Sequence, residues 1–150
     1  MNTRIAFVLS VLGLALSSSG FAQDCEVTID STDQMTFKKD EIVVSADCEQ
    51  ITLTLNHVGK LPANTMGHNW VLAATVDAQA VVNDGMAAGL SNDYVKPDDE
   101  RVLAATEIVG GGESTTITFG LDNLDPAGDY QFFCTFPGHY VLMKGEFRIE

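Results

Sequence analysis

The sequence predicts an all-β fold, a sandwich of two sheets with one helical insertion. Short runs alternate apolar and polar residues, as in residues 51–56, and this period of two is typical of strands with one buried face. Gly, Pro and Asn separate these runs at short intervals. One stretch, residues 75–90, breaks the alternation. Many short strands separated by turns favour two sheets packed face to face.

The expected elements follow from this pattern in chain order. Between residues 75 and 90, apolar residues fit the stripe of a helix that begins near Asp77, although Asn83-Asp84-Gly85 should weaken or end it. Residues 91–100 form a polar loop, and Trp70, the only tryptophan, belongs to the core. The expected strands are residues 26–29, 42–44, 51–56, 69–74, 102–109, 115–119, 131–134 and 142–149.

Residues 1–22 have the pattern of a cleaved secretory signal. Arg4 supplies the basic start, residues 5–16 the apolar segment, and residues 17–22 a small-residue cleavage region before Gln23. The apolar segment is too short to span a bilayer, which needs about 20 residues. We therefore expect no membrane anchor, an exported chain, and one domain over residues 23–150.

The chain is strongly acidic. It has 8 Lys and Arg against 21 Asp and Glu, a net charge of −13, and loss of the leader with Arg4 makes this −14. Nucleic acid is excluded as a default partner because its binding requires a basic surface. Asp122, Asp125 and Asp129 lack the spacing of a calcium loop, so we interpret them as turn residues.

Three cysteines make an odd number for an exported protein. We expect Cys25 and Cys48 to pair, because oxidation is favoured outside the cytoplasm. Closing their loop should stabilise the fold by about 3 kcal/mol. Cys134 is left over, and metal ligation would explain an unpaired thiol there. The alternative is a buried, inert thiol.

A metal site is indicated around this third cysteine. Cys134, His139 and Met143 lie within ten residues, and the Pro137-Gly138 turn would bring the first two together. A thiolate, an imidazole and a thioether suit copper better than calcium or magnesium. A second nitrogen is needed, and His68 is the better candidate because Gly67 before it permits close approach of the backbone.

Two motifs then identify a family resemblance. Residues 64–70, Asn-Thr-Met-Gly-His-Asn-Trp, and residues 134–139, Cys-Thr-Phe-Pro-Gly-His, resemble those of the azurins, periplasmic blue-copper proteins of the cupredoxin family. The resemblance extends from about Cys25 to the C-terminus. It implies an eight-stranded Greek-key sandwich, cupredoxin-like, and a mononuclear type 1 copper centre that shuttles one electron between Cu(II) and Cu(I) in the periplasm.

The resemblance also implies a role for each site residue. His68, Cys134 and His139 would form a trigonal plane, with Met143 as a long axial ligand and the Gly67 carbonyl opposite it. His57 would be a packed histidine beside the centre. Asn69 and backbone amides near Phe136 would hydrogen-bond the thiolate.

An apolar rim around His139 is implied as well, and it would suit brief docking with redox partners. Those partners would be c-type cytochromes and copper-containing reductases, and we expect the chain to be a monomer. The rim consists of Met35, Leu61, Met66, Met86, Phe136, Pro137 and Leu142.

Two other functions fit parts of the pattern. A copper carrier or storage protein would use the same ligands without passing electrons, although a buried thiol on rigid strands opposes ready exchange of metal. A thiol hydrolase would use Cys134 and His139, but the sequence offers no clear orienting group or oxyanion motif. Zinc can also occupy such a ligand set.

Overall fold

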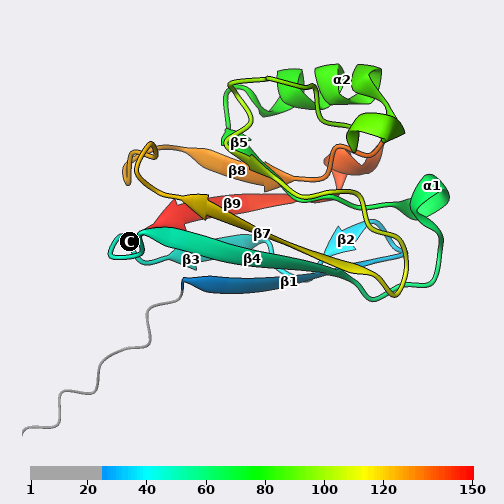
Figure 1. Cartoon of the computed structure of the whole chain (residues 1–150), viewed down its shortest axis with the longest axis horizontal. Coiled ribbons are helices and arrows are strands. Elements are labelled where there is room, and N and C mark those ends of the chain that lie inside the picture. Colours follow the sequence, from blue (N-terminus) through cyan, green and yellow to red (C-terminus); the bar gives the residue numbers. More distant parts are fainter. Residues whose placement is uncertain (1–24) are drawn as a thin grey trace, which may run out of the picture.

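The computed structural model describes residues 25–150, which form two facing β-sheets (Figure 1). The four-stranded sheet has the order β2-β1-β4-β7, and the five-stranded sheet has the order β3-β9-β8-β5-β6. Their bounds are β1 Glu26–Thr32, β2 Thr36–Phe37, β3 Glu41–Val44, β4 Gln50–His57, β5 Val71–Ala74, β6 Ala104–Ala105, β7 Ser114–Gly120, β8 Tyr130–Phe133 and β9 Lys144–Ile149.

The predicted two-sheet sandwich is confirmed, with nine strands where eight were expected. The additional strand is the two-residue β2, which pairs with the end of β1. β1 pairs with β4, and β3 with β9, in parallel, whereas the other neighbours are antiparallel. The predicted leader, residues 1–22, lies outside the described residues.

Two α-helices interrupt the strands, one more than expected. The helix α2 (Ala78–Ala88) lies inside the predicted range, and α1 (Ala63–Met66) was not expected. The helix α2 continues through Asn83-Asp84-Gly85, so the prediction that these residues could end it is wrong. A Cβ at Gly85 would lie 2.1 Å from the Tyr94 carbonyl oxygen, so glycine permits α2 to pack against the following loop. Among the described residues, no helix is long and apolar enough to cross a membrane.

The expected strand over residues 102–109 is wrong for most of its length. Only Ala104–Ala105 forms β6, and the chain that precedes β5 is paired next at the isolated bridge between His68 and Val109. Val71 pairs with Ala105, so residues 69–70 lie between the two pairings on one side and residues 106–108 on the other. The side that contains β6 therefore has one extra residue. Such a bulge leaves backbone groups without a partner in the sheet. The Ile108 N–H is one of them, and it bonds instead to the Asp93 carboxylate.

Trp70 is at the centre of the core, as expected. It is fully buried and its ring stacks on Phe119 and Phe132, with centroids 5.9 Å away in each case. Within residues 25–150, its Nε1 is the one buried side-chain polar atom without a hydrogen-bond partner. A second, smaller cluster lies where α2 covers the five-stranded sheet, and it includes Val81, Val82 and Phe133.

The strand directions bring several distant loops to one end of the sandwich. β1 and β4 run parallel and end at Thr32 and His57. β5 begins where β8 ends, since Val71 pairs with Phe133, and β9 begins beside it. The loops at this end therefore carry α1 and the 3₁₀ turn η2 (His139–Val141), and they lie opposite the C-terminus (Figure 1).

Candidate metal centre

Three of the predicted ligands meet at this end of the sandwich. The Nδ1 atoms of His68 and His139 lie 3.2 Å apart. Cys134 Sγ lies 4.0 Å from His68 Nδ1 and 3.7 Å from His139 Nδ1. His68 and Cys134 are fully buried and His139 is 3% exposed. Two nitrogens and one sulfur therefore form a triangle inside the protein.

This triangle fits a single transition-metal ion. An ion at the centre of a trigonal plane, roughly 2.0 Å from each nitrogen and roughly 2.3 Å from sulfur, would hold the nitrogens about 3.5 Å apart. It would place each nitrogen about 3.7 Å from the sulfur. The observed edges lie within about 0.3 Å of these lengths. The donor set, two imidazoles and one thiolate, is the one that copper electron-transfer sites use.

His68 is held in the orientation that ligation requires. It directly follows Gly67, where α1 ends, and its Nε2 lies 2.9 Å from the Thr32 carbonyl oxygen. A carbonyl only accepts, so Nε2 carries the proton and Nδ1 presents its lone pair to the triangle. Burial lowers the pKa of His68 to about 4, against the opposing effect of the Thr32 carbonyl, so the ring is neutral at pH 7.

Cys134 follows the last residue of β8. Its backbone N–H donates to the Met143 carbonyl, 3.0 Å away, which joins the two ends of the ligand loop. Burial raises the pKa of the thiol to about 12, and backbone N–H groups of Asn69 and Phe136 bonded to the sulfur act in the opposite direction. Those donors would stabilise the thiolate once an ion replaces the proton.

His139 is delivered by a tight turn rather than by a strand. Gly138 has φ of 83°, in the left-handed region that favours glycine, and η2 begins at His139. Burial lowers the pKa of His139 to about 4, so this ring is also neutral at pH 7. Its ring packs on that of Phe136, with centroids 4.5 Å apart.

Met143 and Gly67 lie next to the triangle. Met143 is fully buried, and its N–H donates to the His139 carbonyl, 2.8 Å away. Gly67 is buried too, and a Cβ there would lie 2.3 Å from the Ala63 carbonyl oxygen. Glycine is therefore required where the chain passes from α1 into the site.

His57 lies beside the centre but offers it no ligand atom. Its ring stacks on that of His68, with centroids 4.4 Å apart. Nδ1 accepts the Gly59 N–H at 3.0 Å, and Nε2 lies 2.9 Å from the Met66 carbonyl. Both ring nitrogens are therefore occupied, and the histidine acts as a packed neighbour.

Asn69 joins three parts of the site. Its Nδ2 donates to the Asp93 carbonyl and to Thr135 Oγ1, and its Oδ1 accepts the Thr135 N–H. The sequence pointed to Asn69, but not to Thr135, Asp93 or the Thr32 carbonyl. No feature of the sequence could indicate the Thr32 carbonyl, because every residue type has a backbone carbonyl.

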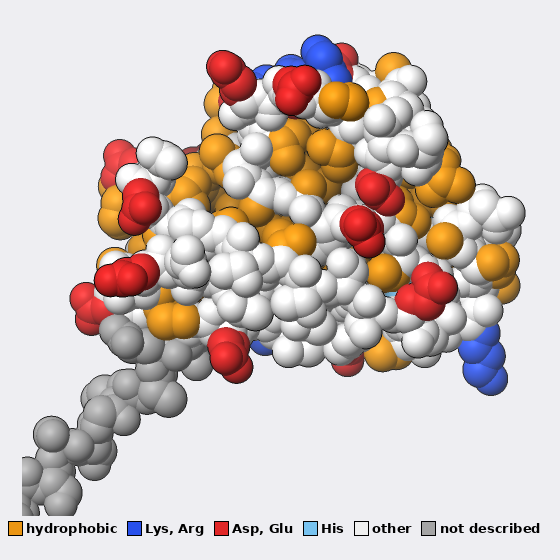
Figure 2. Space-filling view, in the orientation of Figure 1, with side chains coloured by type: hydrophobic (Ala, Val, Ile, Leu, Met, Phe, Trp, Pro, Cys, Tyr) orange, Lys and Arg blue, Asp and Glu red, His pale blue; other side chains and the backbone are white. Residues whose placement is uncertain are grey.

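The residues expected to form the apolar rim occupy loops at this end, together with α2. Leu61, Met86, Pro137 and Leu142 are exposed, whereas Met35, Met66 and Phe136 are half-buried. Val141 is 74% exposed and was missed, although an apolar residue within a turn was a possible signal. Figure 2 shows hydrophobic side chains exposed at the end that carries α1, and acidic side chains scattered across this face.

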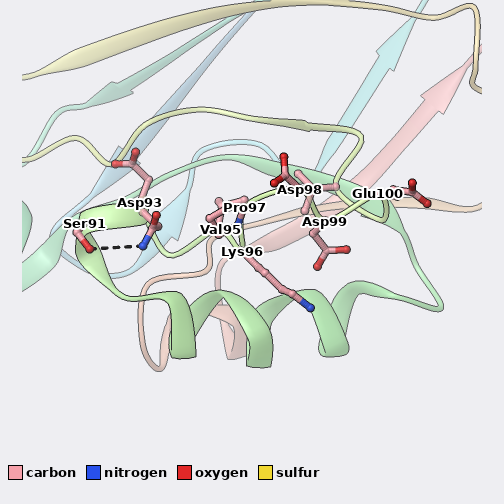
Figure 3. A pocket seen from close by; sticks show the side chains of 10 residues that line it. Ser91, Asp93, Val95, Lys96, Pro97, Asp98, Asp99 and Glu100 are labelled. Carbon is pink, nitrogen blue, oxygen red and sulfur yellow. Dashed lines mark hydrogen bonds between the residues drawn. The ribbon is translucent and has the colours of Figure 1, made fainter.

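A hollow of about 750 Å³ lies elsewhere, along the loop after α2. Val95 and Pro97 line it together with Asp98 and Glu100 (Figure 3). None of the expected ligands lines this hollow, although Asp93, whose carbonyl accepts Asn69 Nδ2, does.

Known proteins resemble this chain over most of its length. The family model for copper-binding proteins of the plastocyanin/azurin family matches residues 23–150. An azurin from Bordetella pertussis is 54% identical over 135 residues, 90% of each chain, and an azurin from Pseudomonas aeruginosa is 49% identical over 150 residues, 100% of each. A solved azurin structure from Methylomonas sp. strain J has a TM-score of 0.81 and 42% identity, and covers 84% of this chain and 98% of that one.

Proposed function

Because the chain belongs to the plastocyanin/azurin family of copper-binding proteins, we propose that it is a periplasmic carrier of single electrons with one copper ion. One observation carries this proposal. Two imidazole nitrogens and one thiol sulfur form a buried triangle whose edges suit a single ion. Copper in such a site supplies a one-electron couple, Cu(II)/Cu(I).

Each residue has a distinct role in this proposal. His68 and His139 would bind the ion through Nδ1 and Cys134 through its thiolate, as the three corners of the triangle. Met143 would contribute its sulfur as a weak further ligand, and the Gly67 carbonyl would be a second weak contact. The disposition of Met143 supports its role, because it is fully buried and bonded through its backbone to both Cys134 and His139.

The surroundings would hold these donors in place whether a bound copper ion is oxidised or reduced. The Thr32 carbonyl fixes the His68 ring, and the amides of Asn69 and Phe136 fix the sulfur. Such outer partners orient ligands and tune a bound metal. A site that keeps the same geometry needs little reorganisation when an electron arrives or leaves.

Electrons would leave through the apolar rim, defined above by seven residues from Met35 to Leu142. His139 is the ligand from the loop that also carries Pro137 and Leu142, both exposed. Weak electron-transfer complexes use small interfaces, and an apolar surface permits several partners. We expect these to be c-type cytochromes and copper-containing reductases. Export to the periplasm accords with the predicted signal at residues 1–22 and with the disulfide between Cys25 and Cys48.

The visible spectrum of oxidised, copper-loaded protein tests this function. We expect an intense thiolate-to-copper band that disappears on reduction and returns on oxidation with unchanged copper content. Loss of copper during each cycle would instead indicate a metal carrier. Cys134→Ser should abolish the band, whereas the double variant Cys25→Ser/Cys48→Ser should retain it. A blue Cys134→Ser protein would refute the assignment of the thiolate.

A further inference from the structure

Two consecutive residues after α2 have a backbone conformation that side chains rarely adopt. Asp93 and Tyr94 both have φ of 53°, in the left-handed region. They follow the 3₁₀ turn η1 (Leu90–Asn92), and hydrogen bonds from both N–H groups hold them there. Figure 3 shows Asp93 beside Ser91, apart from the acidic residues Asp98–Glu100.

Asp93 holds one of the two amides bonded to the Cys134 sulfur. Its carbonyl accepts Asn69 Nδ2 at 2.8 Å, and its carboxylate accepts the Ile108 N–H at 2.9 Å. Ile108 belongs to the bulge opposite His68. Asp93 therefore fixes Asn69, whose N–H bonds to the sulfur, and also the neighbouring backbone that pairs with His68.

Tyr94 packs against the residue that supplies the other amide. Its ring meets that of Phe136 edge-on, with centroids 5.2 Å apart, and Phe136 supplies the second N–H to the sulfur. Phe136 in turn packs on His139. A Cβ at Gly85 would clash with the Tyr94 carbonyl oxygen. The helix α2 therefore packs directly against the turn that contains Asp93 and Tyr94.

We propose that Asp93 and Tyr94 are positioning residues that raise the reduction potential by holding both N–H donors against the Cys134 sulfur. This inference deepens the proposed function and rests on it. An N–H dipole stabilises negative charge on the sulfur, which then donates less strongly to Cu(II), so the reduced state is favoured. Hydrogen bonding around this sulfur is a recognised determinant of the potential.

The holoprotein with copper bound provides the test. Tyr94→Leu removes the aromatic contact. Asp93→Gly permits the left-handed backbone and keeps the carbonyl that accepts Asn69 Nδ2, but it removes the carboxylate that anchors this residue to the Ile108 N–H. Each should lower the ratio of reduced to oxidised protein at a fixed electrode potential by about three- to tenfold, where tenfold equals about 59 mV for one electron. The charge-transfer band should move to lower energy at the same time.

Three variants are matched controls and should keep the potential and the spectrum of the wild type. Tyr94→Phe retains the ring. Asp93→Asn retains an acceptor oxygen and a residue type that tolerates this conformation. Asp98→Gly changes an exposed residue of the same loop, with φ of 56°, and within residues 25–150 its side chain makes no hydrogen bond to Asn69 or Phe136.

The outcomes separate this inference from the function on which it rests. A wild-type protein without the visible band would remove the proposed function. Blue variants with an unchanged potential would overturn the positioning role, even if their melting temperature falls, because a purely structural role lowers stability alone. If Asp93→Gly does not fold, Tyr94→Leu decides, since leucine retains much of the buried volume.

Discussion

Replacing Gly67 with alanine would disturb the centre through sterics alone. Gly67 has φ of −68° and ψ of 148°, which any residue adopts, so alanine adds no backbone strain. The new Cβ would lie 2.3 Å from the Ala63 carbonyl oxygen and 2.6 Å from Ile108 Cγ2. Ordinary contact begins near 3.4 Å, so the chain must move by about 1 Å. Overpacking of this kind costs about 1–3 kcal/mol.

The displacement would reach the metal ligands because His68 is the next residue. Its Nδ1 lies 3.2 Å from that of His139, and a shift of this size would break the trigonal arrangement. We expect denaturant unfolding to show the loss of stability, and the visible band to weaken or shift. Gly120→Ala is the matched control, since its Cβ would lie 3.7 Å from the Asp122 carboxylate, an ordinary contact. Wild-type stability and spectrum in Gly67→Ala would refute the steric reasoning.

Three other predictions concern the axial ligand, the docking surface and acid stability. Met143→Leu should keep the visible band and raise the potential, by on the order of 59 mV in voltammetry, because a weak donor to Cu(II) is lost; an unchanged potential would contradict axial ligation. Leu142→Lys, at a side chain 59% exposed, should slow electron exchange with a c-type cytochrome in stopped-flow. Val76→Lys, at a side chain 88% exposed and outside the rim, should not slow it. Equal exchange rates in the two variants would exclude the rim as the docking surface. The Arg101 guanidinium holds the pKa of Asp99 below its usual value, so their pairing stabilises the fold above the unfolded-state pKa and is lost as pH falls below about 4. In Asp99→Asn, the free energy of unfolding should therefore fall less steeply with acidification, and an unchanged slope would count against the pairing.

The sequence predicted the strands that have a clear period of two, and it failed where tertiary contacts override local pattern. Residues 51–56 were expected as a strand and lie within β4. The four-residue helix α1 is too short to show a helical period. Residues 102–109 look like a strand, but the bulge opposite His68 interrupts the pairing after β6. Nothing local in the sequence marks where a partner strand changes register.

For the candidate site too, the sequence indicated the ligand side chains better than the groups that orient them. The motifs indicated His68, Cys134, His139 and Met143, because soft and nitrogen donors in close spacing are chemically distinctive. The partners that orient them were harder to infer. The Thr32 carbonyl is a backbone acceptor, and the contacts of Asp93 with Asn69 and Ile108 depend on a loop conformation that the sequence alone does not specify.

The geometry of the five-stranded sheet explains why ligands so distant in sequence meet at atomic precision. β5, β8 and β9 are neighbours, and adjacent strands lie about 4.8 Å apart. His68 precedes β5, Cys134 follows β8 and Met143 precedes β9, so the sheet places three of the proposed ligands beside one another. His139 alone depends on a loop, whose turn requires the positive φ of Gly138. In the proposed function, the loop between Cys134 and Met143 could therefore vary in its exposed residues without moving the other three proposed ligands, which the sheet holds.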